Sequence, residues 1–177
     1  MNRAFLSLGS NIAAEKNLPA AVQLLREYGV VRTSSGVWES PALEGADQPN
    51  FLNAAVLLET PLSAVSLRHQ AITHIESVLG RVRNPPNPDA PRPIDIDIML
   101  FNRDIISLGH RHIPDGEILE RAFVALALAE LDPDYIHPQT GQTLAEIASG
   151  FSDESSRFRR REDVNLMAQK GMSMACV

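Results

Sequence analysis

The stretch APRPIDIDIMLF, residues 90–101, alternates isoleucine with aspartate and ends in four apolar residues. A β-strand points successive side chains to opposite faces. We therefore predict a strand over residues 94–101 whose isoleucines enter a core. Asp95 and Asp97 should then share the other face.

Two carboxylates this close repel each other unless a cation joins them. Mg²⁺ prefers oxygen ligands and commonly binds one or two carboxylates, with water and substrate phosphates completing its shell. Asp95 and Asp97 are therefore candidate magnesium ligands in a site for nucleotide phosphates. From the strand alone, an edge strand with two solvated aspartates is an equally open interpretation. The Asp-x-Asp pattern also occurs in metal-dependent sugar transfer.

Positive charge is concentrated near this strand although the chain is acidic, with a net charge of −6 from 16 basic and 22 acidic residues. That balance argues against a nucleic-acid-binding protein, which normally has a basic surplus. Arginine side chains match phosphate oxygens well, although a solvated charge pattern is the alternative. The arginines that flank the loop before the strand, or follow it, are Arg81, Arg83, Arg92, Arg111 and Arg121.

The hydrophobic periodicity of the chain predicts alternating strands and helices. Strands are expected over 4–8, 30–38, 51–60 and 94–101, with helices over 15–28 and 63–79. The order βαββαβ predicts an α+β fold, a ferredoxin-like α/β sandwich in which helices pack on an antiparallel sheet.

Less regular segments surround this core pattern. We expect a loop over 40–50, a short strand at 105–106, and a helix over 119–131 with Glu117 and Glu120 in its first turn. Residues 84–93 hold five prolines, which no helix or inner strand tolerates, so an exposed loop is expected there.

The length of 177 residues suits one domain, which we expect over residues 1–150, followed by a loosely ordered C-terminal tail over 151–177. Cys176 is the single cysteine, so we expect a reducing, cytoplasmic location. The N-terminus has no signal-peptide pattern, and no stretch is apolar enough to span a membrane. The arginine run at 159–161 could bind phosphate, but a solvated tail is favoured.

Two further segments could carry binding chemistry. Residues 9–11 (GSN) lie between a strand and a helix, where backbone amides can bind phosphate; ordinary helix capping is the alternative. Phe51 and Asn53 share one face of a strand and could stack on a flat heterocycle and pair with its edge. A core phenylalanine and a turn asparagine are the alternative there.

Other polar residues give weaker signals. His110 and His112 could share a face, but Asp115 is the one further nearby residue that could complete a zinc site. Glu76 by default is a surface glutamate on the second helix.

Six short motifs occur in a specific order: LGSN (8–11), SPAL (40–43), DQP through FLNAA (47–55), GRVR (80–83), PRPIDID (91–97) and RAFV (121–124). Together they resemble the 6-hydroxymethyl-7,8-dihydropterin pyrophosphokinases of folate biosynthesis, over residues 4 to about 148. This family transfers diphosphate from ATP to the hydroxymethyl group of the dihydropterin and releases AMP. Its fold is the ferredoxin-like sandwich expected above.

The resemblance implies a role for each matching residue. Asp95 and Asp97 correspond to ligands of two Mg²⁺ ions and, with Arg81, Arg83 and Arg92, to the catalytic residues. Residues expected at ATP, the co-substrate, are Glu76, Arg83, Arg92, Ile98, His112 and Arg121. Residues expected at the pterin are Ser40, Pro41, Leu43, Phe51, Asn53 and Phe123, with the two phenylalanines as plates on either side of the ring.

Two departures from the family pattern concern the nucleotide. Many members carry Trp-Gly-Pro-Arg in the loop before the acidic strand, where this chain has DAPR (89–92), and Pro88 replaces a basic residue. Many also have Pro-His-Tyr, whose histidine contacts the phosphates, where this chain has PDG (114–116). We expect His112 or His110 to replace that donor, while Asp115 would repel ATP unless it binds metal or points away.

Two alternatives to an active pyrophosphokinase stay open. One is a non-catalytic pterin- or nucleotide-binding relative, against which the intact pair Asp95 and Asp97 argues. The other is a transferase that acts on another pterin or purine alcohol. The resemblance implies neighbouring folate-pathway enzymes as candidate partners, whereas nucleic acid and membranes are not expected.

Overall fold

The computed structural model of the chain describes residues 1–42, 47–83, 87 and 89–168. The elements of the first half are β1 (Asn2–Ser10), α1 (Ala14–Leu25), β2 (Val30–Ser34), β3 (Trp38–Ser40), β4 (Phe51–Thr60), α2 (Ala64–Ser66), the π-helical turn η1 (Leu67–Ile72) and α3 (Thr73–Val78). Those of the second half are β5 (Asp95–Phe101), β6 (Ile106–Leu108), β7 (Arg111–Ile113), α4 (Glu117–Glu120), α5 (Ala122–Leu131), α6 (Leu144–Ser149), the 3₁₀ turn η2 (Ser155–Arg157) and β8 (Arg159–Arg160).

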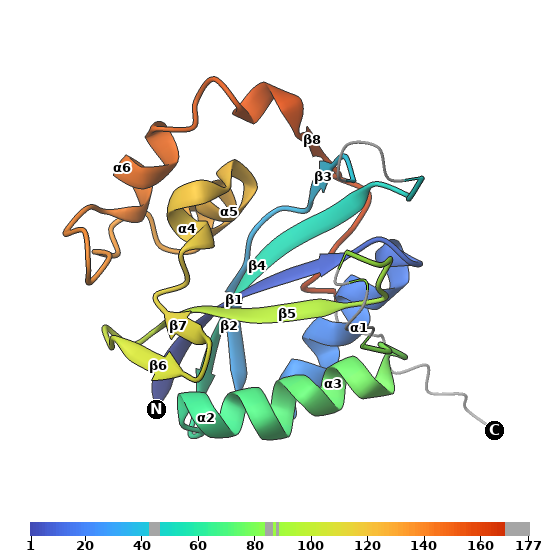
Figure 1. Cartoon of the computed structure of the whole chain (residues 1–177), viewed down its shortest axis with the longest axis horizontal. Coiled ribbons are helices and arrows are strands. Elements are labelled where there is room, and N and C mark those ends of the chain that lie inside the picture. The colour runs from blue at the N-terminus through green and yellow to red at the C-terminus, as the bar shows by residue number, and fades with distance from the viewer. Residues whose placement is uncertain (43–46, 84–86, 88, 169–177) are drawn as a thin grey trace.

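One antiparallel sheet organises the molecule (Figure 1). Its strands follow the order β5-β1-β4-β3-β8, and β2 also pairs with β4. β6 and β7 form a separate hairpin beside β5. The mixed α/β architecture with an antiparallel sheet confirms the predicted fold class.

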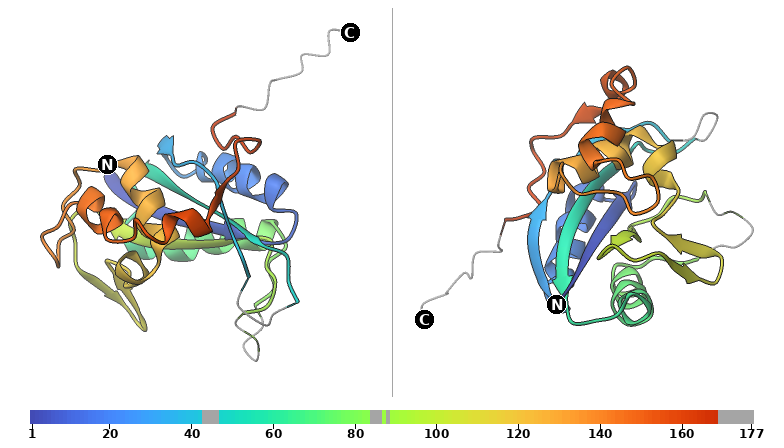
Figure 2. Two further views of the ribbon diagram at one scale, coloured as in Figure 1. Left: turned by 90° about the horizontal axis from the view of Figure 1, so that it is seen from above. Right: turned by 90° about the vertical axis from the view of Figure 1, so that its left-hand side faces the viewer.

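Helices cover both faces of the sheet (Figure 2). The alternation along β1 sends Leu6 and Leu8 into a core with α1 and the α2–α3 helix, and sends Phe5 into a second core with α5 and α6. Phe5 packs there on Tyr135, with ring centroids 4.8 Å apart. Burial of these apolar faces stabilises the sandwich, because it removes apolar surface from water.

β5 has the predicted alternation. Ile94, Ile96 and Ile98 are at most 6% exposed and belong to the first core. The outer edge of β5 is covered by the helix beside it: Ile96 N donates to Glu76 Oε1 at 3.1 Å, and Arg68 Nη1 donates to Ile96 O at 2.9 Å. Side chains thus satisfy polar groups that an edge strand otherwise leaves open.

Three predicted elements differ in detail. The strand expected over 30–38 is two strands, because Ser35 Oγ accepts a hydrogen bond from Ala55 N and interrupts the regular pairing with β4. The helix over 63–79 is continuous but contains the π turn η1. The prediction of a single helix over 119–131 was wrong at Arg121, whose extended backbone (φ −119°, ψ 116°) separates α4 from α5.

Residues 151–168 pack on the domain, which corrects the expectation of a loose tail for this part. β8 pairs with β3, Arg161 N donates to Val37 O at 2.8 Å, and Leu166 is 3% exposed within the first core. The arginine run has no periodicity, so its pairing with β3 could not be predicted locally. Residues 169–177, Cys176 included, lie outside the described residues.

The arginine run also finds carboxylate partners. Arg160 pairs with Glu130 and Glu162, and Arg161 with Glu15, Glu39 and Asp163. None of the helices in the described part of the chain is both long and apolar enough to cross a membrane.

Leu166→Ala tests whether the C-terminal segment is part of the core. We expect the free energy of unfolding to fall by about 2–4 kcal/mol, the cost of truncating a buried leucine. Urea denaturation measures it. The matched variant Leu119→Ala removes a leucine that is 43% exposed and should cost less than about 1 kcal/mol. Equal, small effects of both substitutions would contradict the packing.

Candidate active site

The strand register brings the predicted polar residues into two rows. Asn53 on β4, Gly9 on β1 and Asp95 on β5 are opposite one another in the first row. Ala55, Ser7 and Asp97 form the next row on the same face. A Cβ at Gly9 would lie 3.4 Å from Asn53 Oδ1, so the glycine leaves the surface between Asn53 and Asp95 open.

Asp95 is held by two arginines from the loops before β5. Arg81 Nη1 lies 2.5 Å from Asp95 Oδ1, and Arg92 Nη1 lies 2.9 Å from Asp95 Oδ2. Burial disfavours the charged carboxylate, but these two guanidiniums outweigh it and lower the pKa of Asp95.

Asp97 is compensated less completely. Its Oδ1 accepts a hydrogen bond from Arg111 and lies 3.7 Å from Arg68 Nη1. Burial and the neighbouring charge of Asp95 raise the pKa of Asp97 in spite of these arginines. A further positive charge next to Asp97 would therefore stabilise its ionised form.

Glu76 is buried, so its default interpretation as a surface residue was wrong. Its Oε1 accepts hydrogen bonds from Arg81 Nη1 at 2.7 Å and from Ile96 N, and its Oε2 accepts one from Arg83 Nη2 at 2.8 Å. Glu76 thereby ties two arginines to the outer edge of β5.

These contacts join into one charged network, which we call the arginine cluster: Arg68, Arg81, Arg83, Arg92 and Arg111 around Glu76, Asp95 and Asp97. Five arginines face three carboxylates, which leaves an excess of two positive charges. An acidic chain has thus gathered a local cationic site, as phosphate binding requires.

The predicted pterin residues lie on neighbouring elements. Asn53 Nδ2 donates to Ser40 Oγ at 2.8 Å, and both residues are buried. The Arg92 guanidinium lies 5.8 Å from the centroid of the Phe51 ring. Phe123, in the first turn of α5, packs edge-on against Phe158, with centroids 6.0 Å apart. Pro41 is exposed next to Ser40, and the predicted contact Leu43 lies outside the described residues.

Asn11 ties together the two loops that approach the site. Its Nδ2 donates to Gln48 Oε1 at 3.1 Å, and its Oδ1 accepts from Arg92 N at 2.8 Å. Gln48 Nε2 in turn donates to Asp89 O at 2.9 Å. The capping interpretation of residues 9–11 was wrong, because Ala13 is the N-cap of α1 and no side chain caps it.

The β6–β7 hairpin separates the residues expected at the nucleotide. Arg111 points to Asp97, whereas the next residue, His112, is exposed and its Nδ1 lies 3.3 Å from Ser107 Oγ. Asp115 Oδ1 accepts from Glu117 N at 2.9 Å, at the start of α4. The carboxylate expected to repel ATP is therefore bound to a backbone amide.

Two further predicted ATP contacts differ in exposure. The side chain of Ile98 is 6% exposed and belongs to the core. A contact of this residue with ATP would therefore have to use its backbone. The side chain of Arg121 is 51% exposed and lies 3.3 Å from Glu117 Oε1.

Sequence reasoning missed three residues that the structure adds to the site. Arg68 comes from the π turn η1, a distortion that often occurs at functional sites. Asn11 ties the loops, and Phe158 lies beyond the expected domain end. The motif LGSN marked the position of Asn11 without its role, while neither Arg68 nor Phe158 had a signal in the sequence.

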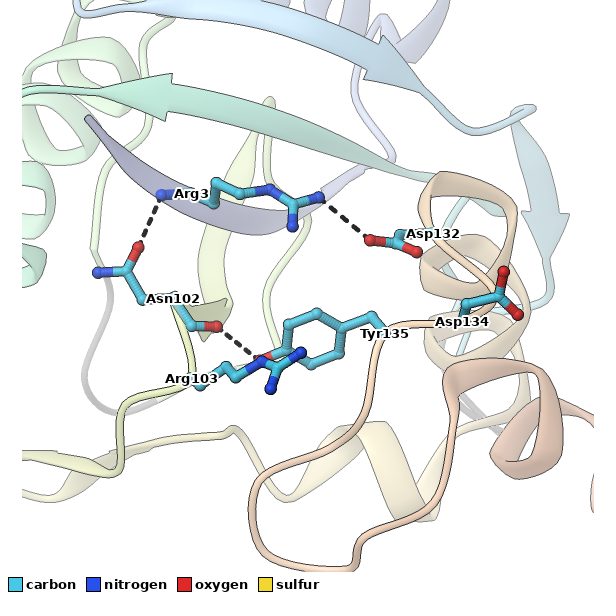
Figure 3. Close-up of a pocket in the computed structure, with 6 residues that line it drawn as sticks. All are labelled: Arg3, Asn102, Arg103, Asp132, Asp134 and Tyr135. Carbon is cyan, nitrogen blue, oxygen red and sulfur yellow. Dashed lines mark hydrogen bonds and ion pairs between the residues drawn. The ribbon is translucent and has the colours of Figure 1, made fainter.

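A cavity of about 330 Å³ lies away from this cluster, at the end of the sheet where β1 begins (Figure 3). Its walls are Arg3, Asn102, Arg103, Asp132, Asp134 and Tyr135. Arg3 pairs with Asp132 at 3.1 Å, and the Tyr135 hydroxyl donates to Asn102 O at 2.6 Å. None of the predicted site residues lines it.

The donor set at Asp95 and Asp97 fits a cation that also binds substrate. Among the described residues, no group of three or more His, Cys, Asp or Glu is placed to hold a metal ion. Two carboxylates suit Mg²⁺ when phosphate and water oxygens complete its shell.

Comparisons with known proteins give the family of this chain. The family model described as 7,8-dihydro-6-hydroxymethylpterin-pyrophosphokinase matches residues 5–133. The Bacillus subtilis protein named 2-amino-4-hydroxy-6-hydroxymethyldihydropteridine pyrophosphokinase is 38% identical over 133 residues, which cover 73% of this chain and 78% of that protein. The Schizosaccharomyces pombe "Folic acid synthesis protein fol1" is 34% identical over 158 residues, 88% of this chain.

The fold itself recurs in a solved structure. A crystal structure of a Plasmodium falciparum HPPK-DHPS triple mutant superposes with a TM-score of 0.72 and 16% identity, over 90% of this chain. The chain spans 46% of that protein and 21% of the S. pombe protein. Because the family model covers well over half of the sequence, this chain belongs to the 7,8-dihydro-6-hydroxymethylpterin-pyrophosphokinase family.

Proposed function

We propose that this chain transfers the β,γ-diphosphate of ATP to the hydroxymethyl group of 6-hydroxymethyl-7,8-dihydropterin, with release of AMP, in the cytoplasm. The observation that carries the proposal is the placement of Asp95 and Asp97 on one face of β5, inside the arginine cluster. A protein that only binds a pterin has no use for a half-buried carboxylate pair, because removing two like charges from water is costly.

The reaction exchanges one phosphorus–oxygen bond for another. The hydroxymethyl oxygen bonds to the β-phosphorus, and the bond from that phosphorus to the oxygen bridging to the α-phosphate breaks. The bridging oxygen leaves with AMP and its electron pair, and the hydroxyl proton is released. Such transfers depend on positioning and charge stabilisation more than on covalent help.

Asp95 and Asp97 would hold two Mg²⁺ ions. The fit rests on the donor set described above and on the incomplete compensation of Asp97. Bound Mg²⁺ would neutralise phosphate charge and align the triphosphate with the pterin hydroxyl.

The arginines would bind the phosphates directly. Arg83 and Arg121 are each 51% exposed and so accessible to a ligand, and Arg92 lies between Asp95 and Phe51. Glu76 is engaged by Arg81 and Arg83 through both carboxylate oxygens. We therefore assign Glu76 an indirect effect on ATP, through the position of these two arginines.

The pterin would stack between Phe51 and Phe123, with Asn53 and the backbone that follows Ser40 reading its polar edge. Residues 1–150 would hold both substrates as a single domain, while Phe158 from the C-terminal segment supports the Phe123 ring. The Plasmodium protein carries the name HPPK-DHPS, and a neighbouring folate-pathway enzyme is the partner we propose.

A product assay tests the reaction. With ATP, Mg²⁺ and hydroxymethyldihydropterin we expect AMP and the pterin diphosphate in equal amounts, separated by ion-exchange chromatography. ADP or inorganic phosphate in place of AMP would indicate a different transfer. Pterin affinity without turnover would favour the non-catalytic relative.

Asp97→Ala tests the metal assignment. We expect turnover to fall about 10³-fold or more. This corresponds to a barrier higher by several kcal/mol, the scale on which metal charge stabilisation contributes. Pterin affinity, measured by fluorescence titration, should change much less. Retained turnover would contradict the role of Asp97.

Phe158→Ala tests the support of the pterin plate. Loss of an edge-to-face aromatic pair should raise the KM for pterin by about 2- to 10-fold, while the KM for ATP stays unchanged. Phe158→Leu, which keeps an apolar side chain, should fall between this variant and the unmodified chain. A parallel rise of both KM values would instead indicate a general loss of structure.

A further inference from the structure

We propose that Arg111 is an exchangeable counter-ion of Asp97. It pairs with the carboxylate before nucleotide binds, and it moves to the nucleotide phosphates when a divalent cation takes its place. This inference rests on the proposed function, because it takes Asp97 as a metal ligand.

The position of Arg111 makes it the movable member of the cluster. It lies on β7 in the β6–β7 hairpin, outside the main sheet, and its side chain is 33% exposed. Within the described residues, Asp97 is the one acidic group that pairs with it. Removal of that contact would leave Arg111 without an ionic partner among the residues that the structure describes.

Arg68, the other cation at Asp97, is fixed. Its side chain is 11% exposed, it donates to Ile96 O at 2.9 Å, and it lies farther from Asp97, at 3.7 Å. It belongs to a continuous helix that also packs on the edge of β5. Arg68 can therefore stay in place when the occupancy of Asp97 changes.

Arg111 and a metal ion would compete for one oxygen atom. Arg111 binds Asp97 Oδ1, and a divalent cation at that oxygen would repel the guanidinium. The displaced arginine needs a new anion, and phosphate oxygens match its geometry. Asp115, which follows β7, uses its Oδ1 to accept a hydrogen bond from Glu117 N, and no ion pair joins it to Arg111 among the described residues.

This exchange predicts two effects of opposite sign. Without Arg111, Asp97 is free for a cation, so a metal alone should bind more tightly. The nucleotide loses a charged donor, so its affinity should fall. A purely structural role of Arg111 would weaken both, because loss of structure harms both sites.

The test uses Arg111→Ala and Arg111→Gln with Mn²⁺ as a spectroscopic probe. Mn²⁺ binding without nucleotide is followed by electron paramagnetic resonance, and a non-hydrolysable ATP analogue with Mg²⁺ by calorimetry. We expect Mn²⁺ affinity to rise by about 3- to 10-fold and analogue affinity to fall by about 10-fold or more, the scale of a charge-assisted hydrogen bond. Arg111→Gln covers the case in which the alanine variant folds poorly.

Arg103→Ala is the matched control. Arg103 is an exposed arginine on the chain between β5 and β6, and it lines the cavity of Figure 3 instead of the cluster. Both affinities should stay unchanged in this variant. Mn²⁺ affinity equal to or lower than that of the unmodified chain in both Arg111 variants would overturn the exchange. Failure of the unmodified chain to form AMP would overturn the proposed function instead, and the Mn²⁺ measurement would still decide the pairing at Asp97.

Discussion

The neutralisation of one buried carboxylate, Glu76, and two half-buried ones, Asp95 and Asp97, by five arginines is the constraint on which the candidate site depends. Glu76, Asp95 and Asp97 lie close together in a partly desolvated region, where isolated negative charges are costly. The arginines offset that cost and leave an excess of positive charge. The arginines that stabilise the carboxylates in the folded chain therefore also form a site suited to phosphate and a divalent cation.

The network also links the site to the edge of the sheet. Glu76 and Arg68 bond to the backbone of Ile96, and through their other contacts they position Arg81, Arg83 and Asp97. The helix that covers the edge of β5 thus serves as the support of the charged side chains. A change in the packing of this helix would move the site, because the same side chains belong to both.

The proposed pterin side of the site depends on segments distant in sequence. β3 is held between β4 and β8, and Phe158 packs on Phe123. The C-terminal segment therefore acts on both proposed pterin contacts, Ser40 on β3 and Phe123 on α5. Asn11 similarly joins the loops that carry Gln48 and Arg92. These contacts explain how a site composed of loop and strand residues is held in one geometry.

Local pattern determined the alternation of β5, the clustering of arginines near Asp95 and Asp97, and the succession of strands and helices up to β5, apart from the split of residues 30–38 into β2 and β3. These features depend on the periodicity and charge of nearby residues. Arg68, Asn11 and Phe158 could not be assigned that way, since their roles arise from contacts across 28 to 81 positions or with the C-terminal segment. Tertiary structure likewise decided that Arg111, and not His112, faces Asp97, because this depends on how β7 lies in the hairpin. Sequence determined which charges are present, while tertiary packing decided which of them meet, because ion pairs depend on distance in space.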